Sequence, residues 1–149
     1  MIKQSDILTA INRMIGAAFP NYTVYINACP KDFARPSFLL KYIKLSQTDA
    51  TRFTVEKTVS ITITCFVSVD KHDRSDMDEL ANLQDQVIQL FLPGYIKVGD
   101  RALKVQSSTG GIDPDRAYID LEFNFFDDRT DVEDMNPLIA SVSTIIKEG

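Results

Sequence analysis

Apolar and hydroxyl-bearing side chains alternate through residues 53–69, the longest strand-like pattern in the chain. Odd-numbered positions are mainly apolar, whereas Thr and Ser occupy most even-numbered positions, and Phe66 is the large apolar exception among them. Residues 116–126 repeat the alternation, with Asp120 and Glu122 on the polar side. A period of two is typical of a strand with one buried face and one polar face. The sequence therefore predicts two long strands that share a core.

Two segments carry apolar residues at helical spacing instead. These are residues 5–19, with Ser5 as the expected N-cap, and a helix that starts after Ser75 and ends before Pro93-Gly94. Shorter strands are expected over residues 23–28 and 37–45, and on both sides of a tight turn at Gly99-Asp100. Residues 29–36, 47–53 and 107–115 are expected to be turns or loops, because Pro, Gly, Ser, Thr and Asp are common there.

These elements predict an α+β domain. Both helical stripes need the apolar face of the long strands, so an antiparallel or mixed β-sheet with two helices packed on one face is expected. We expect this domain to span residues 1–128. Residues 129–149 are expected to form an acidic tether and a C-terminal amphipathic helix, because Asn136-Pro137 can start a helix and apolar residues follow at helical intervals.

Length and charge narrow the possible functions. The 149 residues suit one domain, and the formal net charge of −5 argues against sequence-specific nucleic-acid binding, which usually needs a basic stripe. No apolar run approaches the roughly 20 residues of a membrane span. Cys29 and Cys65 make neither a disulfide framework nor a zinc site, and Cys65 is expected to be a buried free thiol, although a Cys29–Cys65 bridge is conceivable.

Candidate chemistry is sparse, and we predict no catalytic residue, no cofactor and no metal site. His72 lies among Asp residues but lacks the ligand spacing of a metal site, so a solvated loop is the favoured interpretation. Gly110-Gly111 is not followed by the Lys-Ser/Thr of a phosphate-binding loop. Asp120 and Glu122 could form a carboxylate pair, but a wet sheet face explains them as well. The chain is therefore not expected to be an enzyme.

Two features favour a component of an assembly. The long strands expose a polar face and leave sheet edges to be covered, and the terminal apolar stripe needs a surface, either on its own sheet or on a neighbouring subunit. The polar face and edge of residues 59–69 are therefore candidates for a subunit contact. The subunit-interface candidates are Ser60, Thr62, Thr64, Ser68, Leu138, Val142 and Ile145.

The order of these elements, and two segments in particular, resemble a known family. The segments are "RPSFLLKYIKLSQTDATRFTVEKTVSITITCFVSVD" and "IKVGDRALKVQSSTGGIDPDRAYIDLEFNFF". In the first, a Pro and large apolar residues lead through a polar turn into a long alternating strand, and the second is similar to the family's hairpin and last strand. The pattern resembles tail terminator proteins from phages and prophages of Gram-positive bacteria. The likeness covers residues 5–126, and the terminal helix lies outside it.

The resemblance implies a structural protein of the virion. Tail terminators form rings, typically homohexamers, that cap the tail tube, stop its polymerisation and present an attachment surface for the head–neck connector protein. The resemblance thus implies assembly in the host cytoplasm and partners that include further copies of the chain, the tail tube protein and, in a contractile particle, the tail sheath. DNA would pass through the hole without specific binding, and we expect Asp120 and Glu122 to repel it if they line that hole.

Two other interpretations remain open. The chain could be another neck or tail-completion protein, such as a head–tail connector, which would differ in the end of the particle that it binds. It could also be a small α+β ligand-binding module outside viruses, which would need a concave pocket with convergent polar groups.

Overall fold

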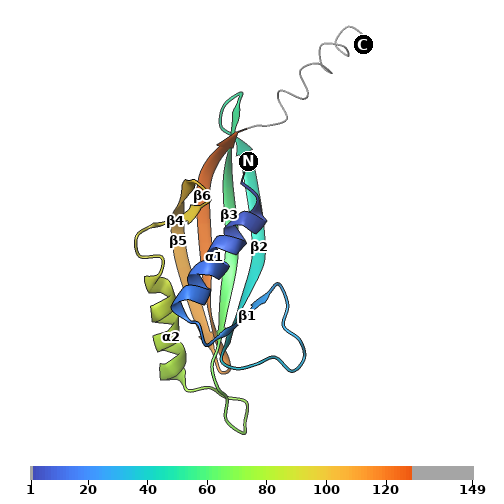
Figure 1. Cartoon of the computed structure of the whole chain (residues 1–149), viewed down its shortest axis with the longest axis vertical. Helices are drawn as coiled ribbons and strands as arrows, with labels where there is room; N and C mark the ends of the chain where they lie inside the picture. Colours follow the sequence, from blue (N-terminus) through green and yellow to red (C-terminus); the bar gives the residue numbers. More distant parts are fainter. Residues whose placement is uncertain (1, 129–149) are drawn as a thin grey trace.

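A computed structural model describes residues 2–128, which form an α+β fold with a curled six-stranded sheet (Figure 1). The strand order is β1-β2-β3-β6-β5-β4. The first pair is parallel and the other pairs are antiparallel, so the sheet is mixed. The elements are α1 (Gln4–Ala18), β1 (Thr23–Ile26), β2 (Ser37–Asp49), β3 (Thr54–Phe66), α2 (Met77–Gln89), β4 (Tyr95–Val98), β5 (Arg101–Asp113) and β6 (Arg116–Asp128).

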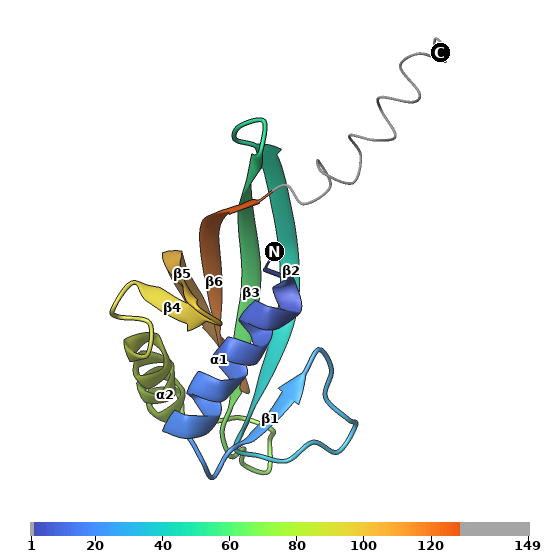
Figure 2. The same cartoon turned by 45° about the horizontal axis from the view of Figure 1, so that its top comes forward.

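One apolar cluster joins both helices to one face of the sheet, which we call the inner face (Figure 2). The helices supply regularly spaced apolar residues, and the odd-numbered residues of β3 and β6 face them from the sheet. This arrangement confirms the predicted helices on one face of the sheet. The buried residues at its centre are Ile7, Ile11, Ile15, Leu80, Val87, Ile61, Ile63, Ile119, Leu121 and Phe123.

The helix starts differ from those predicted. α1 is preceded by Lys3, whose backbone N–H donates to Asp6 at 2.9 Å, so Ser5 lies inside the helix instead of capping it. α2 is capped by Asp76, whose carboxylate accepts from the Asp78 N–H at 3.0 Å. Ser75 is buried instead, and its backbone N–H donates to the Pro114 carbonyl. At α2 the Asp76 carboxylate therefore supplies the cap acceptor expected from Ser75, whereas at α1 the Asp6 carboxylate closes the first turn by accepting the N–H of Lys3.

Two strands run further than predicted. β2 continues to Asp49 and β5 continues to Asp113, so residues 47–49 of the expected turn and residues 107–113 of the expected loop are strand. Each extension pairs with a long central strand, and this pairing outweighs the weak β-propensity of Gly, Ser and Asp. At Gly110 a Cβ atom would lie 2.5 Å from the Tyr118 carbonyl oxygen and 2.7 Å from Gln84 Nε2. Glycine there allows α2 to approach the sheet closely.

β3 is a central strand, and the expectation of a sheet edge at residues 59–69 is wrong. β2 pairs with it on one side and β6 on the other, because the strand that follows β3 in the chain joins the sheet further away. The long outer strands are β2 and β5. β1 pairs only with residues 37–40 of β2, and β4 pairs only with residues 101–104 of β5.

The outer strands contain irregularities at nearly the same level of the sheet. The register shifts between Tyr42 and Lys44 in β2, and between Val105 and Ser107 in β5. Both shifts lie opposite the stretch of the sheet where Ser60 pairs with Glu122. Bulges increase local bending and twist, so two of them at one level favour the curled shape of the sheet.

Candidate subunit-interface surfaces

The face of the sheet that points away from the helices is polar, and we call it the outer face. It consists of the even-numbered residues of β3 and β6, together with their cross-strand neighbours on β2 and β5. The register places them in rows that run across the four strands. The central residues are Thr58, Ser60, Thr62 and Thr64 of β3, and Tyr118, Asp120, Glu122 and Asn124 of β6.

Three of the predicted interface residues lie together on the outer face. Ser60 and Thr64 are each 8% exposed, and Thr62 is half-buried, because longer neighbours in the adjacent strands partly cover them. Ser68 is exposed but lies beyond the end of β3, so it does not share this surface. Leu138, Val142 and Ile145 lie outside the described residues, as does the predicted C-terminal helix.

The two acids assigned to the lumen also lie on the outer face. The Thr62 hydroxyl donates to the Asp120 carboxylate, and Ser107 Oγ lies 3.5 Å from Glu122 Oε1. In the next row, Asn124 Nδ2 donates to Glu56 Oε2 at 3.0 Å. Hydroxyl and amide groups therefore engage the carboxylates of this surface and orient them.

The outer face also carries lysines whose place on it the sequence pattern does not predict. Lys41 pairs with Thr62 in the row of Asp120, and Lys44 pairs with Ser60 in the row of Glu122. Both lysines are exposed at the β2 side of the sheet. Each acid thus lies two strands from a lysine, and the surface is charge-balanced instead of uniformly acidic. The closeness of the lysines to the acids follows from the register of β2 against β3, and it cannot be read from their spacing along the chain.

The loop between β1 and β2 covers one end of the outer face. Phe66, which interrupts the row of hydroxyl groups, is only 2% exposed because the Phe33 ring packs 4.6 Å from it and the Arg35 guanidinium lies 5.1 Å from its centre. Arg35 Nη1 also donates to the Val67 carbonyl at 2.9 Å. Arg116 lies 5.1 Å from the same ring, and its hydrogen bonds to Asp115 lower the pKa of that carboxyl group. Phe66, the exception in the sequence pattern, therefore packs against the β1–β2 loop and holds it on the sheet.

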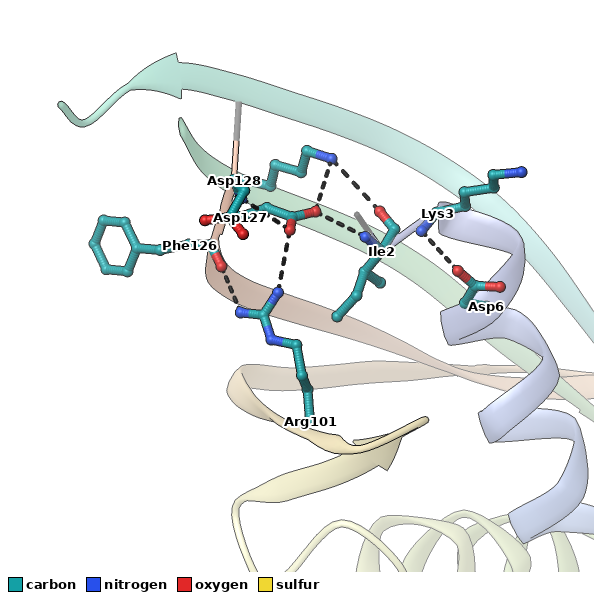
Figure 3. A network of polar contacts seen from close by, with 8 residues as sticks. Ile2, Lys3, Asp6, Arg101, Phe126, Asp127 and Asp128 are labelled. Atoms are coloured by element: carbon teal, nitrogen blue, oxygen red, sulfur yellow. Dashed lines mark hydrogen bonds and ion pairs between the residues drawn. The ribbon is translucent and has the colours of Figure 1, made fainter. Parts of the chain in front are cut away.

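A polar cluster closes the other end of the inner face (Figure 3). Lys57 Nζ lies 3.3 Å from Asp127 Oδ2, and the two side chains are 9% and 4% exposed. Arg101 Nη1 lies 3.2 Å from Asp127 Oδ1, and the Ile2 N–H donates to Oδ2 at 2.8 Å. This cluster ties the start of the chain to the end of β6. The sequence pattern does not reveal this cluster, because Lys57 and Asp127 are charged residues at inner-face positions of strands.

The Asp127 carboxylate is stabilised in its charged form. Burial by itself raises its pKa, but the backbone N–H groups of Ile2 and Asp128 and the Lys57 ammonium all donate to the carboxylate, and the net effect is a lowered pKa. Removing one partner of such a pair leaves the other charge buried without compensation. The cluster is therefore important for the stability of this end of the fold.

Both cysteines and His72, for which local chemistry was predicted, lie within residues 2–128. Cys65 is buried, Cys29 is partly exposed, and both are free thiols. The backbone N–H groups of His72 and Arg74 donate to Asp70, which places His72 in an exposed loop as predicted. Within this part of the chain, no group of three His, Cys, Asp or Glu side chains is placed to hold a metal ion. None of its helices is long and apolar enough to cross a membrane.

A cleft of about 480 Å³ lies between the N-terminal half of α1 and the β4–β5 turn. Arg13, Asp100, Arg101 and Asp127 are among the residues that line it. Because Asp127 is already bound by Lys57, Arg101 and the Ile2 backbone, its carboxylate serves the internal cluster.

Comparison with known proteins identifies one family. A family model described as "Phage tail terminator protein" matches residues 6–135. No curated protein matches the chain. Among solved structures 27 chains match, and one of these, which carries no functional name, is 11% identical with a TM-score of 0.43 over 87% of this chain and 97% of its own. That likeness is too distant to inform function.

Proposed function

Because this chain belongs to the phage tail terminator family, whose members are structural proteins of the virion tail, we propose that it forms a ring that caps the tail tube. The ring stops tube polymerisation and presents the surface to which the head–neck connector attaches. The observation that carries this proposal is the family match, which extends over residues 6–135 and includes most of α1, α2 and every strand of the sheet.

A ring needs two different contact surfaces on each copy. Closed rings form by heterologous contacts, in which one surface of a subunit meets a different surface of the next. The fold offers such a pair, because its sheet ends in β2 on one side and in β5 on the other, apart from the short strands β1 and β4. Growth of the tube ends when one side of the ring matches the tube and the opposite side lacks the surface on which tube subunits add.

The outer face suits the wall of a passage for DNA. Its hydroxyl groups bind water before assembly, and its lysines are balanced by Asp120 and Glu122. A charge-balanced wall neither captures phosphate groups nor repels them strongly, so DNA can slide past it. Assembly in the host cytoplasm, homohexamer formation and contact with the tube protein complete the proposal. The chain performs no bond-making chemistry in this role.

Tail length tests the proposed function. Deleting the gene from the phage that encodes it should give tubes of irregular and excessive length without heads, and the wild-type chain supplied in trans should restore uniform tails. Electron micrographs measure both. Tails of normal, uniform length that merely lack heads in the deletion would contradict termination and would assign the chain to the neck instead.

A further inference from the structure

Each long outer strand of the sheet has a stretch without a neighbouring strand. β1 leaves residues 41–48 of β2 uncovered on their outer side, and β4 leaves residues 106–113 of β5 uncovered. We call these stretches the β2 edge and the β5 edge. They are equal in length. On their inward side they pair with β3 and β6, and on their outer side neither pairs with another strand of residues 2–128.

Most of each edge is open to solvent. Residues 43–48 are all exposed, and so are residues 106–110. An open strand edge presents a row of backbone N–H and C=O groups that another strand can pair with, and natural proteins usually shorten, cover or pair such edges. Here the covering strands β1 and β4 shield only one third of β2 and β5, and they do so at opposite ends of the sheet.

The strand directions suit pairing between neighbours in a ring. β2, β3, β6 and β5 are antiparallel in succession, so β2 and β5 run in opposite directions. If the axis of the ring runs roughly along the strands, the rotation from one copy to the next leaves the direction of each strand unchanged. The β2 edge of one copy therefore meets the β5 edge of the next as an antiparallel pair, and this contact is heterologous, as ring closure requires.

One register matches the two edges and keeps outer-face residues on the same side. It places Ser46 opposite Thr109 and Thr48 opposite Ser107. Within one copy, Ser46 pairs with Thr58, whereas Thr109 pairs through Asp120 with Thr62. On β3, the rows of Ser46 and Thr109 are therefore 62 − 58 = 4 residues apart. Passing across the four strands of one copy to the next thus shifts the register by four residues, or one residue per strand.

A shift of this size is what a closed barrel needs. Closing a sheet requires tilted strands and a fixed stagger, and a barrel of eight strands with a shear of eight, also one residue per strand, has a tilt of about 36°. The displacement of the two edges toward opposite ends of the sheet is thus compatible with closure. Charge also matches, because this register places Lys44 opposite Gly111, two residues from Asp113.

We propose that the β2 edge of each copy pairs with the β5 edge of the next, so that β2, β3, β6 and β5 of all copies form one continuous barrel with the outer faces lining its hole. This inference rests on the proposed ring and adds its contact surface and register. It excludes a contact in which two β2 edges meet, because that pairing is isologous and ends at a dimer.

Paired cysteines test the register inside assembled particles. The variant Ser46→Cys/Thr109→Cys, in a Cys29→Ser background, replaces exposed side chains with others of similar size. Supplied to the deletion phage under reducing conditions, it should give tails of normal length. Oxidation of those particles should then give a ladder of covalent oligomers up to the full ring on a non-reducing gel, because cross-strand cysteines lie within disulfide distance.

The single variants Ser46→Cys and Thr109→Cys are the controls, and both should remain monomeric after oxidation. Normal tails without a ladder, both for this pair and for Thr48→Cys/Ser107→Cys, would overturn the edge pairing and leave the terminator role intact. Dimers from Ser46→Cys alone would overturn it in favour of β2–β2 contact.

Amide hydrogen exchange of the wild-type chain gives a second test that needs no variant. The amides of residues 41–48 and 106–113 that point away from β3 and β6, about every second one, should exchange at least tenfold more slowly in isolated tails than in the free chain, whereas those of the Gly99-Asp100 turn should not change. Unchanged exchange in either edge would contradict the inference. Irregular tails in the gene deletion are a separate result that tests only the proposed function.

Discussion

Replacing Asp127 with Asn should destabilise the fold strongly, because this carboxylate is the centre of the polar cluster at the end of the inner face. It accepts from the Ile2 N–H, lies 3.3 Å from Lys57 Nζ and lies 3.2 Å from Arg101 Nη1. In the variant, the Lys57 ammonium, whose side chain is 9% exposed, loses its countercharge. Breaking a buried pair costs about 3–5 kcal/mol, and we expect about 3 because Asn keeps one oxygen acceptor.

Urea unfolding at pH 7 measures this loss. With a slope of about 2 kcal/mol per M, a change of about 3 kcal/mol lowers the unfolding midpoint by about 1.5 M. Asp128→Asn is the matched control one residue away, because the Asp128 side chain is exposed and accepts no bond in the cluster. This control should move the midpoint by less than a quarter of that amount.

The effect of Asp127→Asn should also depend on pH. The pKa of Asp127 is lower in the folded chain than its usual value, so its stabilisation is present above the unfolded pKa of about 3.9 and is lost as the pH falls through the folded pKa. Wild type and variant should therefore converge in stability as the pH drops below about 4. Equal midpoints at pH 7, or a difference that persists undiminished at low pH, would refute the assigned role of the cluster.

Four further outcomes are expected. Gly110→Ala should lower the free energy of unfolding by about 1–3 kcal/mol, because its Cβ would lie 2.5 Å from a backbone oxygen, whereas Gly16→Ala, with open space around it, should raise it by about 0.5–1 kcal/mol in urea titrations. The Cys65 thiol should resist a thiol reagent at pH 8 until the chain unfolds, since burial raises its pKa to about 12. Rings with Asp120→Asn and Glu122→Gln should retain DNA in a salt-sensitive manner. The positive charges of Lys41 and Lys44 are then no longer offset by these carboxylates and can bind phosphate groups. The same two changes at Glu79 and Asp85 of α2 should have no such effect. Deleting residues 129–149 should leave the urea midpoint unchanged but impair tail assembly, and an insoluble product would place that segment in the core.

Much of the fold follows from the sequence where the pattern is local. The alternation of β3 and β6 gave the apolar residues of the inner face, and the helical stripes gave α1 and α2, because burial of one face imposes a period that is visible along the chain. The same reasoning mistook residues 107–113 for a loop. Their Gly and Ser content indicates a turn locally, but pairing with β6 along its length keeps them extended.

The candidate surfaces were harder to predict, because they depend on which strands are neighbours. Sequence order suggested that β3 had a free edge, whereas the chain inserts β6 next to it. The proximity of Lys41 to Asp120, the cover that Arg35 gives Phe66, and the pairing of Lys57 with Asp127 all join residues that are far apart in the chain. No spacing rule encodes such contacts, so only the register reveals them.

A reconstruction of the head-proximal tail end by electron cryo-microscopy, in the phage that encodes this chain, would examine the proposed role most directly. We predict a single closed ring of copies at the last tube layer, with a continuous sheet around the hole and the β2 edge of each copy next to the β5 edge of its neighbour. A tail end without this chain, or with copies whose sheets do not surround the passage, would contradict the proposal.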